Sequence, residues 1–232
     1  MLLLALDTAT AQVGVAIGDG GDVRSEVRIV GGRRHAEQLA PAIQFVCHES
    51  GVDLDQLAAI AVGIGPGLFT GLRVGVTTAT VMAQALRVPV IDVPSLDLVA
   101  YPLQHVGRLI VAVLDARRGE VFHARYRPVP GGVQRDGEYA VGKVEELVAD
   151  LEAVGEEVLL AGDGVARHHE AFAKLERSEL AGPQFAAPSV AALVELATAR
   201  FEREQFCAPW DVHPMYLRES DAALMISRGP GR

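Results

Sequence analysis

The residues best suited to chemistry are two aspartates that each follow a strongly apolar run. Asp7 closes "LLLALD" and is followed by Thr8 and Thr10, and Asp115 closes "LIVAVLD". If the two turns that follow them faced each other across a cleft, their carboxylates could hold metal-bound water and their backbone N–H groups could hold nucleotide phosphates. These four residues are therefore the candidate nucleotide-binding set, which we take as weak and vestigial.

The two turns do not suit this chemistry equally. The turn after Asp7 has small residues that leave room for an oxygen ligand, whereas the turn after Asp115 reads "ARRG", with bulky side chains where glycine would let the backbone approach a phosphate. The alternative is that both aspartates only accept hydrogen bonds from amides of their own turns. The sequence favours this alternative, and the nucleotide site is kept as the second interpretation.

A glycine-rich stretch, "VGIGPGLFTGLRVGV" at 62–76, resembles a phosphate-binding loop but fails both common motifs. Leu68 and Thr70 stand where the dinucleotide fingerprint needs glycine, and no Gly-Lys pair precedes Thr70 as a Walker A loop requires. We expect Gly65, Pro66 and Gly67 to form a rigid turn before Thr70, which sets the angle at which the next helix leaves its sheet.

Other catalytic patterns are absent from the sequence. None of the seven histidines forms H-x-x-x-H or H-E-x-x-H, so no metal site is expected. No G-x-S-x-G occurs, and Ser95 and Ser189, which each follow proline, are predicted to be helix N-caps. We therefore predict no catalytic residue and no cofactor.

Composition narrows the class of protein. A net charge of −9 over 232 residues argues against holding nucleic acid unaided, because phosphate binding depends on clusters of Lys and Arg. Cys47 and Cys207 lack metal or disulfide spacing, and the opening "MLLLALDTAT" lacks a basic n-region and is too short to span a membrane. We expect a cytoplasmic protein without membrane contact, with a disordered tail at 226–232.

The pattern of apolar residues occurs twice. Three strands, a helix, a strand and a helix are predicted from residue 2 to 86, followed by a short strand, and the same order follows from 109. A tandem βββαβα unit with an aspartate after its first strand is the layout of the actin-like ATPase superfamily, an α/β class with a ribonuclease H-like fold. We predict an N-terminal lobe at 1–101 and a C-terminal lobe at 102–225.

The helix after the glycine-rich loop carries a ridge of small residues every four positions: Gly71, Gly75, Ala79 and Ala83. Glycine in a helix interior costs about 1 kcal/mol relative to alanine, so the two glycines indicate close approach to another element. That element is either the chain's own sheet or a helix of a second molecule. The wide apolar surface of this helix leaves room for both.

Five stretches in order over nearly the whole chain resemble the TsaB (YeaZ) family of bacterial proteins. They are "LALDTAT", "HAEQLAP", "VGIGPGLFTGLRVG", "LDARRGEVF" and "HPMYLRES". The chain departs from the family pattern at Leu68, a position where serine is frequent. The resemblance implies a two-lobed, actin-like, cytoplasmic protein needed to make threonylcarbamoyladenosine (t6A) in tRNA. It also implies that the chain is not itself an enzyme but pairs with the homologous catalytic subunit TsaD, which the ATPase TsaE joins.

The family resemblance further implies a heterodimer surface on the helices after His35 and after Phe69, which would form a homodimer without the partner and would reach tRNA only through the complex. The catalytic relative has H-x-x-x-H on its first helix, whereas this chain has Leu39 four residues after His35. The expected interface comprises His35, Leu39, Ile43, Phe69, Gly71, Arg73, Gly75, Ala79 and Ala83.

Two other functions compete with this scaffold role. The first is a self-sufficient nucleotide-dependent transferase or kinase, which would use Asp7, Thr10 and Asp115 around magnesium and ATP. The second is a peptidase, which the lack of paired metal ligands or a nucleophile motif makes the least favoured.

Overall fold

The first strand, β1 (Leu2–Asp7), is apolar up to its final aspartate because helices cover both faces of its sheet. In the computed structural model, which describes residues 1–31 and 34–218, β1 is the centre of five strands in the order β3-β2-β1-β4-β5. β2 pairs antiparallel with β1 and with β3, whereas β4 pairs parallel with β1 and with β5. The bounds are β2 (Gln12–Asp19), β3 (Asp22–Val30), β4 (Ala59–Gly63) and β5 (Val90–Val93).

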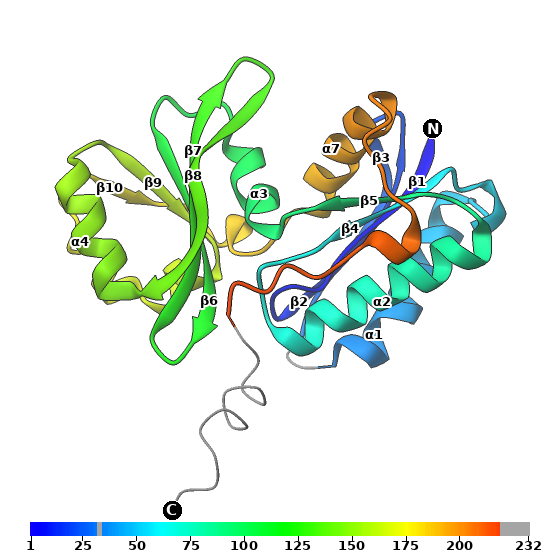
Figure 1. The fold of residues 1–232 in the computed structure, drawn as a ribbon, viewed down its shortest axis with the longest axis horizontal. Helices are drawn as coiled ribbons and strands as arrows, with labels where there is room; N and C mark the ends of the chain where they lie inside the picture. The colour runs from blue at the N-terminus through cyan, green and yellow to red at the C-terminus, as the bar shows by residue number, and fades with distance from the viewer. Residues whose placement is uncertain (32–33, 219–232) are drawn as a thin grey trace, which may run out of the picture.

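Alternate side chains of β1 enter two separate apolar cores. Leu4 and Leu6 lie in the core under α1 (His35–Ser50) and α2 (Phe69–Leu86), and Leu3 lies in the core under α7 (Val190–Glu202). Figure 1 shows α1 and α2 below this sheet and α7 above it. Because successive residues of a strand point to opposite faces, a continuous apolar run is what a sheet covered on both sides requires.

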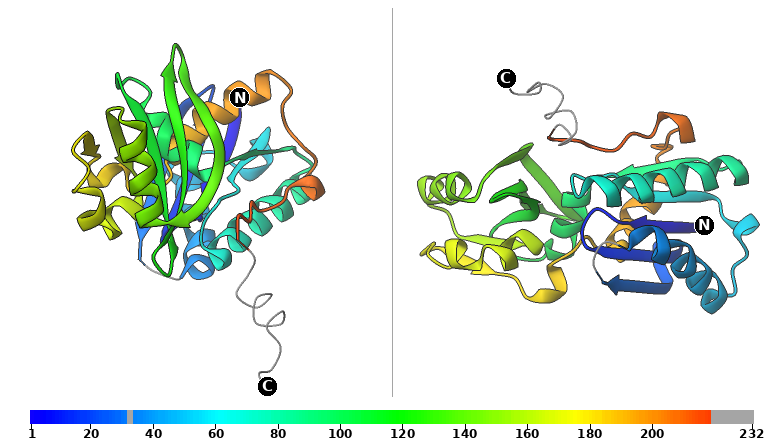
Figure 2. Two further views of the ribbon diagram at one scale, coloured as in Figure 1. Left: turned by 60° about the vertical axis from the view of Figure 1, so that its left-hand side comes forward. Right: turned by 90° about the horizontal axis from the view of Figure 1, so that it is seen from below.

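The second lobe repeats the first. Its strands run in the order β10-β9-β6-β7-β8, with β6 central, antiparallel to β7 and parallel to β9. The tandem α/β prediction, the actin-like layout, is confirmed, and the two lobes lie side by side (Figure 2). The bounds are β6 (Leu109–Arg117), β7 (Glu120–Val129), β8 (Gly132–Lys143), β9 (Val158–Ala161) and β10 (Ser178–Leu180).

The helices of the second lobe also form two layers. Leu147 and Phe172 come from one layer and pack with one side of β6, whereas Leu96 and Val99 come from α3 and pack with the other. The helices are α3 (Ser95–Ala100), α4 (Val144–Val154), α5 (Asp163–Arg167) and α6 (His169–Phe172), with single 3-10 turns at η1 (Leu54–Gln56), η2 (Tyr101–Leu103), η3 (Pro183–Phe185) and η4 (Pro209–Asp211).

The strands of the two sheets lie on either side of residue 101 in the chain, but two helices pack on the sheet from the other side of that position. α7, assigned from the sequence to the C-terminal lobe, packs instead on all five strands of the N-terminal sheet, and α3, assigned to the N-terminal lobe, packs on β6. The N-terminal lobe is therefore built from two separate parts of the chain. The predicted tail at 226–232 lies outside the described residues, and none of the described helices has the length and hydropathy needed to cross a bilayer.

Candidate functional site

The first candidate turn, which follows β1, is buried and its aspartate is fully used by the protein itself. Asp7 Oδ1 accepts a hydrogen bond from the Ala9 amide at 2.9 Å, and Asp7 Oδ2 accepts one from the Ser95 hydroxyl at 2.7 Å. The Ser95 hydroxyl in turn accepts from the Gly65 amide at 3.0 Å. Burial raises the pKa of Asp7, and the hydrogen bonds from Ser95 and Ala9 oppose that rise. Ser95 is thus a link in this network, and the N-cap predicted for it is wrong.

The glycine-rich stretch fills the space next to this turn. A Cβ atom at Gly63 would overlap the Asp7 carboxylate, one at Gly67 would overlap the Ala9 carbonyl, and one at Gly71 would overlap the Thr8 carbonyl. These glycines recur every four residues, so each brings backbone against the turn.

Hydrogen bonds join the same two segments. The Thr8 hydroxyl donates to the Gly71 carbonyl at 2.7 Å, and the Leu68 amide donates to the Ala9 carbonyl at 2.7 Å. The peptide bond between Gly65 and Pro66 is cis, and Gly65 has a φ of 96°. The space that a phosphate would need beside the first turn is therefore occupied by the loop and the start of α2.

The ridge of small residues faces the chain's own sheet, which decides between the two alternatives left open by the sequence. Ala79 and Ala83 are fully buried in the core under α1 and α2, and a Cβ at Gly75 would overlap the Thr8 hydroxyl. Leu39 and Ile43 lie in the same core. In this conformation the chain itself covers these residues and Gly71, and their place in a partner surface stays a prediction.

His35 is also an internal residue rather than the surface residue expected. Its side chain is buried, and its Nε2 donates a hydrogen bond to the Thr10 carbonyl at 2.7 Å. His35 therefore fixes the end of the first turn from the N-terminus of α1. Of the predicted interface residues, Phe69 and Arg73 are exposed.

The second candidate turn, between β6 and β7, is closed by side chains instead of backbone. Asp115 accepts from the Arg117 amide at 2.9 Å and forms ion pairs with the Arg117 and Arg167 guanidinium groups, both at 3.3 Å. Arg117 and Arg118 have φ values of 67° and 58°, so the turn adopts the left-handed conformation without glycine at those positions. Each aspartate thus accepts from the amide two residues after it, as the alternative to a nucleotide site predicted.

A second carboxylate, Asp163 at the start of α5, lies beside Asp115. Asp163 Oδ1 accepts from the Asp115 amide at 2.9 Å, and burial, reinforced by the charge of Asp115, raises the pKa of Asp163 to about 6. His168 Nε2 lies 4.0 Å from Asp115 Oδ1. Within residues 1–31 and 34–218, no group of three or more His, Cys, Asp or Glu is placed to hold a metal ion.

The outer sides of α1 and α2 expose apolar side chains. Phe45 on α1 is 51% exposed and Val81 on α2 is 58% exposed, and the alanine and proline at 40 and 41 on α1 are also exposed. At the start of α2 the Arg73 guanidinium lies 3.9 Å from the centre of the Phe69 ring. Exposed large apolar side chains are a common feature of protein–protein contact surfaces.

Comparison with known proteins establishes the family. A family model described as TsaD, tRNA N6-adenosine threonylcarbamoyltransferase, matches residues 27–225. The chain is 30% identical to the tRNA threonylcarbamoyladenosine biosynthesis protein TsaB of Haemophilus influenzae over 100% of this chain and 98% of that protein. The chain belongs to the TsaB family.

Other relatives separate TsaB from the transferase. The Escherichia coli TsaB is 29% identical over 96% of each chain, and the structure of YeaZ from Pseudomonas aeruginosa superposes with a TM-score of 0.81 at 31% identity, covering 93% of this chain and 99% of that one. A tRNA N6-adenosine threonylcarbamoyltransferase from Erythrobacter litoralis matches 29% of this chain and 20% of its own length. The TsaB proteins thus match over nearly the whole chain, whereas this transferase matches over a part of it.

Proposed function

We propose that this chain is a non-catalytic scaffold subunit of the bacterial machinery that makes t6A in tRNA. In this role it binds and stabilises a TsaD-like catalytic subunit, joined by a TsaE-like ATPase, in the cytoplasm. The chain itself needs no cofactor and reaches tRNA through the complex. Membership of the TsaB family, whose curated members are tRNA threonylcarbamoyladenosine biosynthesis proteins, supports the pathway.

One observation supports a non-catalytic role: the chain's own backbone fills the space beside the first turn. In a nucleotide-binding relative of this fold the turn after the first strand must leave room for phosphate oxygens. Here the backbone of Gly67 and Gly71 stands against that turn, and both oxygens of Asp7 already accept hydrogen bonds from the protein. A nucleotide could enter only by displacing buried backbone contacts.

The partner surface that we propose is the outer side of α1 and α2, centred on Phe45 and Val81 and reaching Phe69 and Arg73. It uses the two helices expected from the sequence, but their outward residues in place of the buried ridge. Without the catalytic subunit the same surface would join two copies of the chain, because a self-complementary patch suits a two-fold dimer.

Introducing a charge at an exposed apolar residue tests the partner surface. Phe45→Glu and Val81→Glu should each weaken binding of the purified TsaD homologue by about tenfold or more, because a carboxylate in a buried interface loses its hydration. Val154→Glu, on an exposed apolar residue of α4 in the other lobe, is the matched control and should bind normally. Normal binding by both α1 and α2 variants in calorimetry would place the partner elsewhere.

Titration of the chain alone with ATP and magnesium tests the non-catalytic assignment. We expect no binding heat from folded protein. Heat that saturates at one site per chain and is lost in Asp7→Ala would favour the competing transferase or kinase function. One similar structure, from Pseudomonas aeruginosa, is described as resembling the peptidase YeaZ. Peptidase activity is the least supported function here, since the described residues provide no metal-ligand group.

A further inference from the structure

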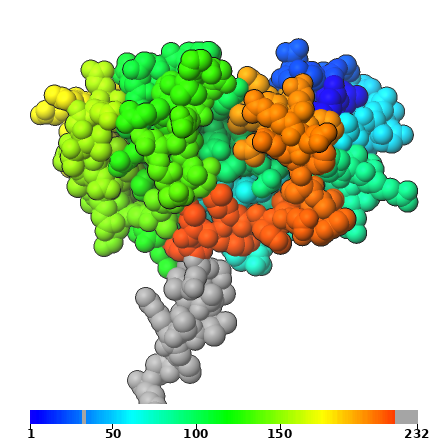
Figure 3. Space-filling view, turned by 45° about the horizontal axis from the view of Figure 1, so that its top comes forward, coloured from blue at the N-terminus to red at the C-terminus, as the bar shows by residue number. Residues whose placement is uncertain are grey.

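The end of the described chain crosses from one lobe to the other. Residues 213–218 follow η4 and are here named the strap. The strap contacts the start of α2 and ends on the β6–β7 turn. Figure 3 shows it in orange-red, reaching from one lobe to the other. On the N-terminal lobe the Met215 amide donates to the Ile64 carbonyl at 2.8 Å. Met215 also packs against the core under α1 and α2.

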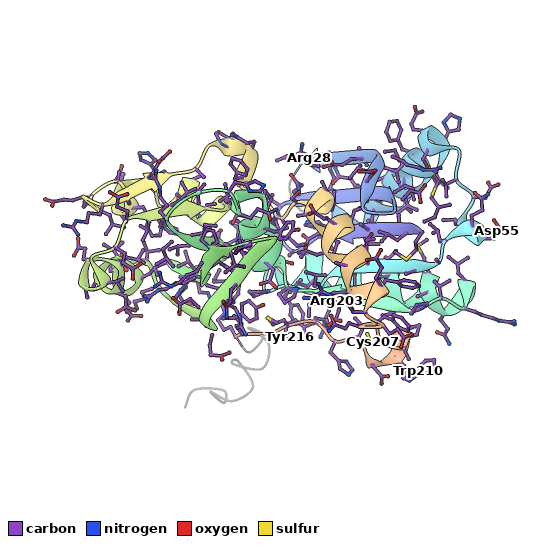
Figure 4. All side chains as sticks on the ribbon, turned by 90° about the horizontal axis from the view of Figure 1, so that it is seen from above. Arg28, Asp55, Arg203, Cys207, Trp210 and Tyr216 are labelled. Atoms are coloured by element: carbon purple, nitrogen blue, oxygen red, sulfur yellow. The ribbon has the colours of Figure 1, made fainter. Side chains whose placement is uncertain are left out.

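Tyr216 strengthens the attachment to the N-terminal lobe. Its ring lies 5.3 Å from the Phe69 ring, and its hydroxyl accepts a hydrogen bond from Arg73 Nε at 3.3 Å. Figure 4 labels Tyr216 where the strap passes between the two lobes. Aromatic pairs at this separation are stabilising beyond the apolar area that they bury.

The other end of the strap is attached to the C-terminal lobe. Leu217 packs against the core between α3 and β6, and Arg218 Nη1 donates to Glu120 Oε2 at 2.8 Å and to the Ala116 carbonyl at 3.3 Å. Ala116 and Glu120 flank the second candidate turn. Two neighbouring residues, Tyr216 and Leu217, therefore contact different lobes.

The strap is the third crossing between the lobes. The first, between β5 and β6, contains α3, and the second, between β10 and α7, is bound to the first by the Ser189 amide, which donates to the Leu98 carbonyl at 3.2 Å. Two crossings that are bonded to each other form one connection, about which two lobes can rotate. A separate third crossing restricts that rotation.

We propose that the strap is a releasable latch that holds the two lobes in one orientation and couples the second turn to the start of α2. Its release is feasible because the ion pair that holds it to the C-terminal lobe lies near solvent: the Arg218 and Glu120 side chains are 26% and 32% exposed. Loss of the contacts with one lobe frees the contacts with the other, because neighbouring residues of the strap make both sets and the strap contains no helix or strand of its own.

Hydrogen exchange read at both ends of the strap tests this coupling in the full-length chain. Arg218→Ala breaks the contact with the C-terminal lobe, and we expect amides at 64–73 of the N-terminal lobe to exchange about tenfold faster. Tyr216→Ala breaks the contact with the N-terminal lobe, and amides of the β6–β7 turn should then exchange faster by a similar factor. Small-angle scattering should show a larger radius of gyration for both variants.

Two further variants complete the design. Arg203→Ala removes an exposed arginine that precedes the strap and forms none of these contacts, and it should leave both ends unchanged. Arg218→Lys keeps the charge opposite Glu120 and should restore most of the protection. The latch is excluded if each alanine variant alters exchange only at its own lobe and the radius of gyration stays that of the parent chain.

Discussion

The first turns of the two lobes start from the same unit and are closed in different ways. Each follows the central strand of its sheet and begins with an aspartate that accepts from the amide two residues on. In the N-terminal lobe, glycine backbone and Ser95 close the first turn and bury it. In the C-terminal lobe, arginine side chains close the second turn by ion pairing. One repeated framework can thus close the turn after its central strand either through close backbone packing or through ion pairing.

The comparison predicts which turn depends on glycine. Gly71→Ala should lower the free energy of unfolding by about 3 kcal/mol or more, since its Cβ would overlap the Thr8 carbonyl and neither backbone can move freely. Gly119→Ala, in the second turn at a φ of 76°, meets no atom and should cost only about 1 kcal/mol for its left-handed conformation. Urea denaturation measures both.

Gly107→Ala is the matched control for these two variants. Gly107 has open space around it and no positive φ, so the change should alter stability by less than about 0.5 kcal/mol. Equal losses for Gly71→Ala and Gly119→Ala would contradict the view that only the first turn is closed by backbone.

Ser95 tests the polar part of the first turn. Ser95→Ala leaves Asp7 Oδ2 and the buried Gly65 amide without their partner and should cost about 2 kcal/mol. Ser50→Ala, which removes a hydroxyl that donates to a helix carbonyl near solvent, should cost less than about 0.5 kcal/mol. A loss for Ser95→Ala no greater than that of Ser50→Ala would show that the network adds little stability.

Asp163, beside the second turn, makes the stability of the protein depend on pH. Its pKa is about 6 in the folded protein against an ordinary 3.8, so the folded state holds its proton more tightly than the unfolded state does. Stability therefore falls as the pH rises from below 4 to above 6. Asp163→Asn keeps the oxygen that accepts from the Asp115 amide and removes the buried charge, so it should stabilise the protein by about 1 to 2 kcal/mol at pH 7.5.

Thermal unfolding at pH 7.5 and pH 4 measures this effect. At pH 4 most of the stabilisation should disappear, since the carboxyl is then protonated in the folded state and, close to its ordinary pKa of 3.8, nearly half protonated in the unfolded state. If Asp163→Asn instead destabilises the protein equally at both values, Asp163 is ionised in the fold and stabilised by its arginine neighbours.

The fold was predictable where local pattern determines it. The apolar runs and their turns predicted both sheets, because a strand buried on both faces has few other sequences available. The ridge on α2 was also visible, but its direction was not: a helix that is apolar on more than one side does not show which side meets the sheet.

The contacts that close the first turn depend on residues far apart in sequence. Asp7 and Ser95 are separated by 88 positions, and the proline before Ser95 indicated an N-cap more strongly than a link to Asp7. The strap escaped prediction for a similar reason, since Tyr216 and Arg218 lie in a stretch without periodicity. The Gly-x-x-x-Gly spacing from Gly63 to Gly75 was the available signal for the filled turn.

The return of α7 to the first lobe has a consequence for synthesis on the ribosome. One face of the N-terminal sheet, including Leu3, Ala5 and Ile91, is covered by α7 alone for much of its area. That face must remain uncovered until residue 202 has left the exit tunnel, whereas the strands of the second lobe are complete by residue 180. The lobe that is translated first is thus finished last, and its open apolar face is the part of the nascent chain that most needs a chaperone.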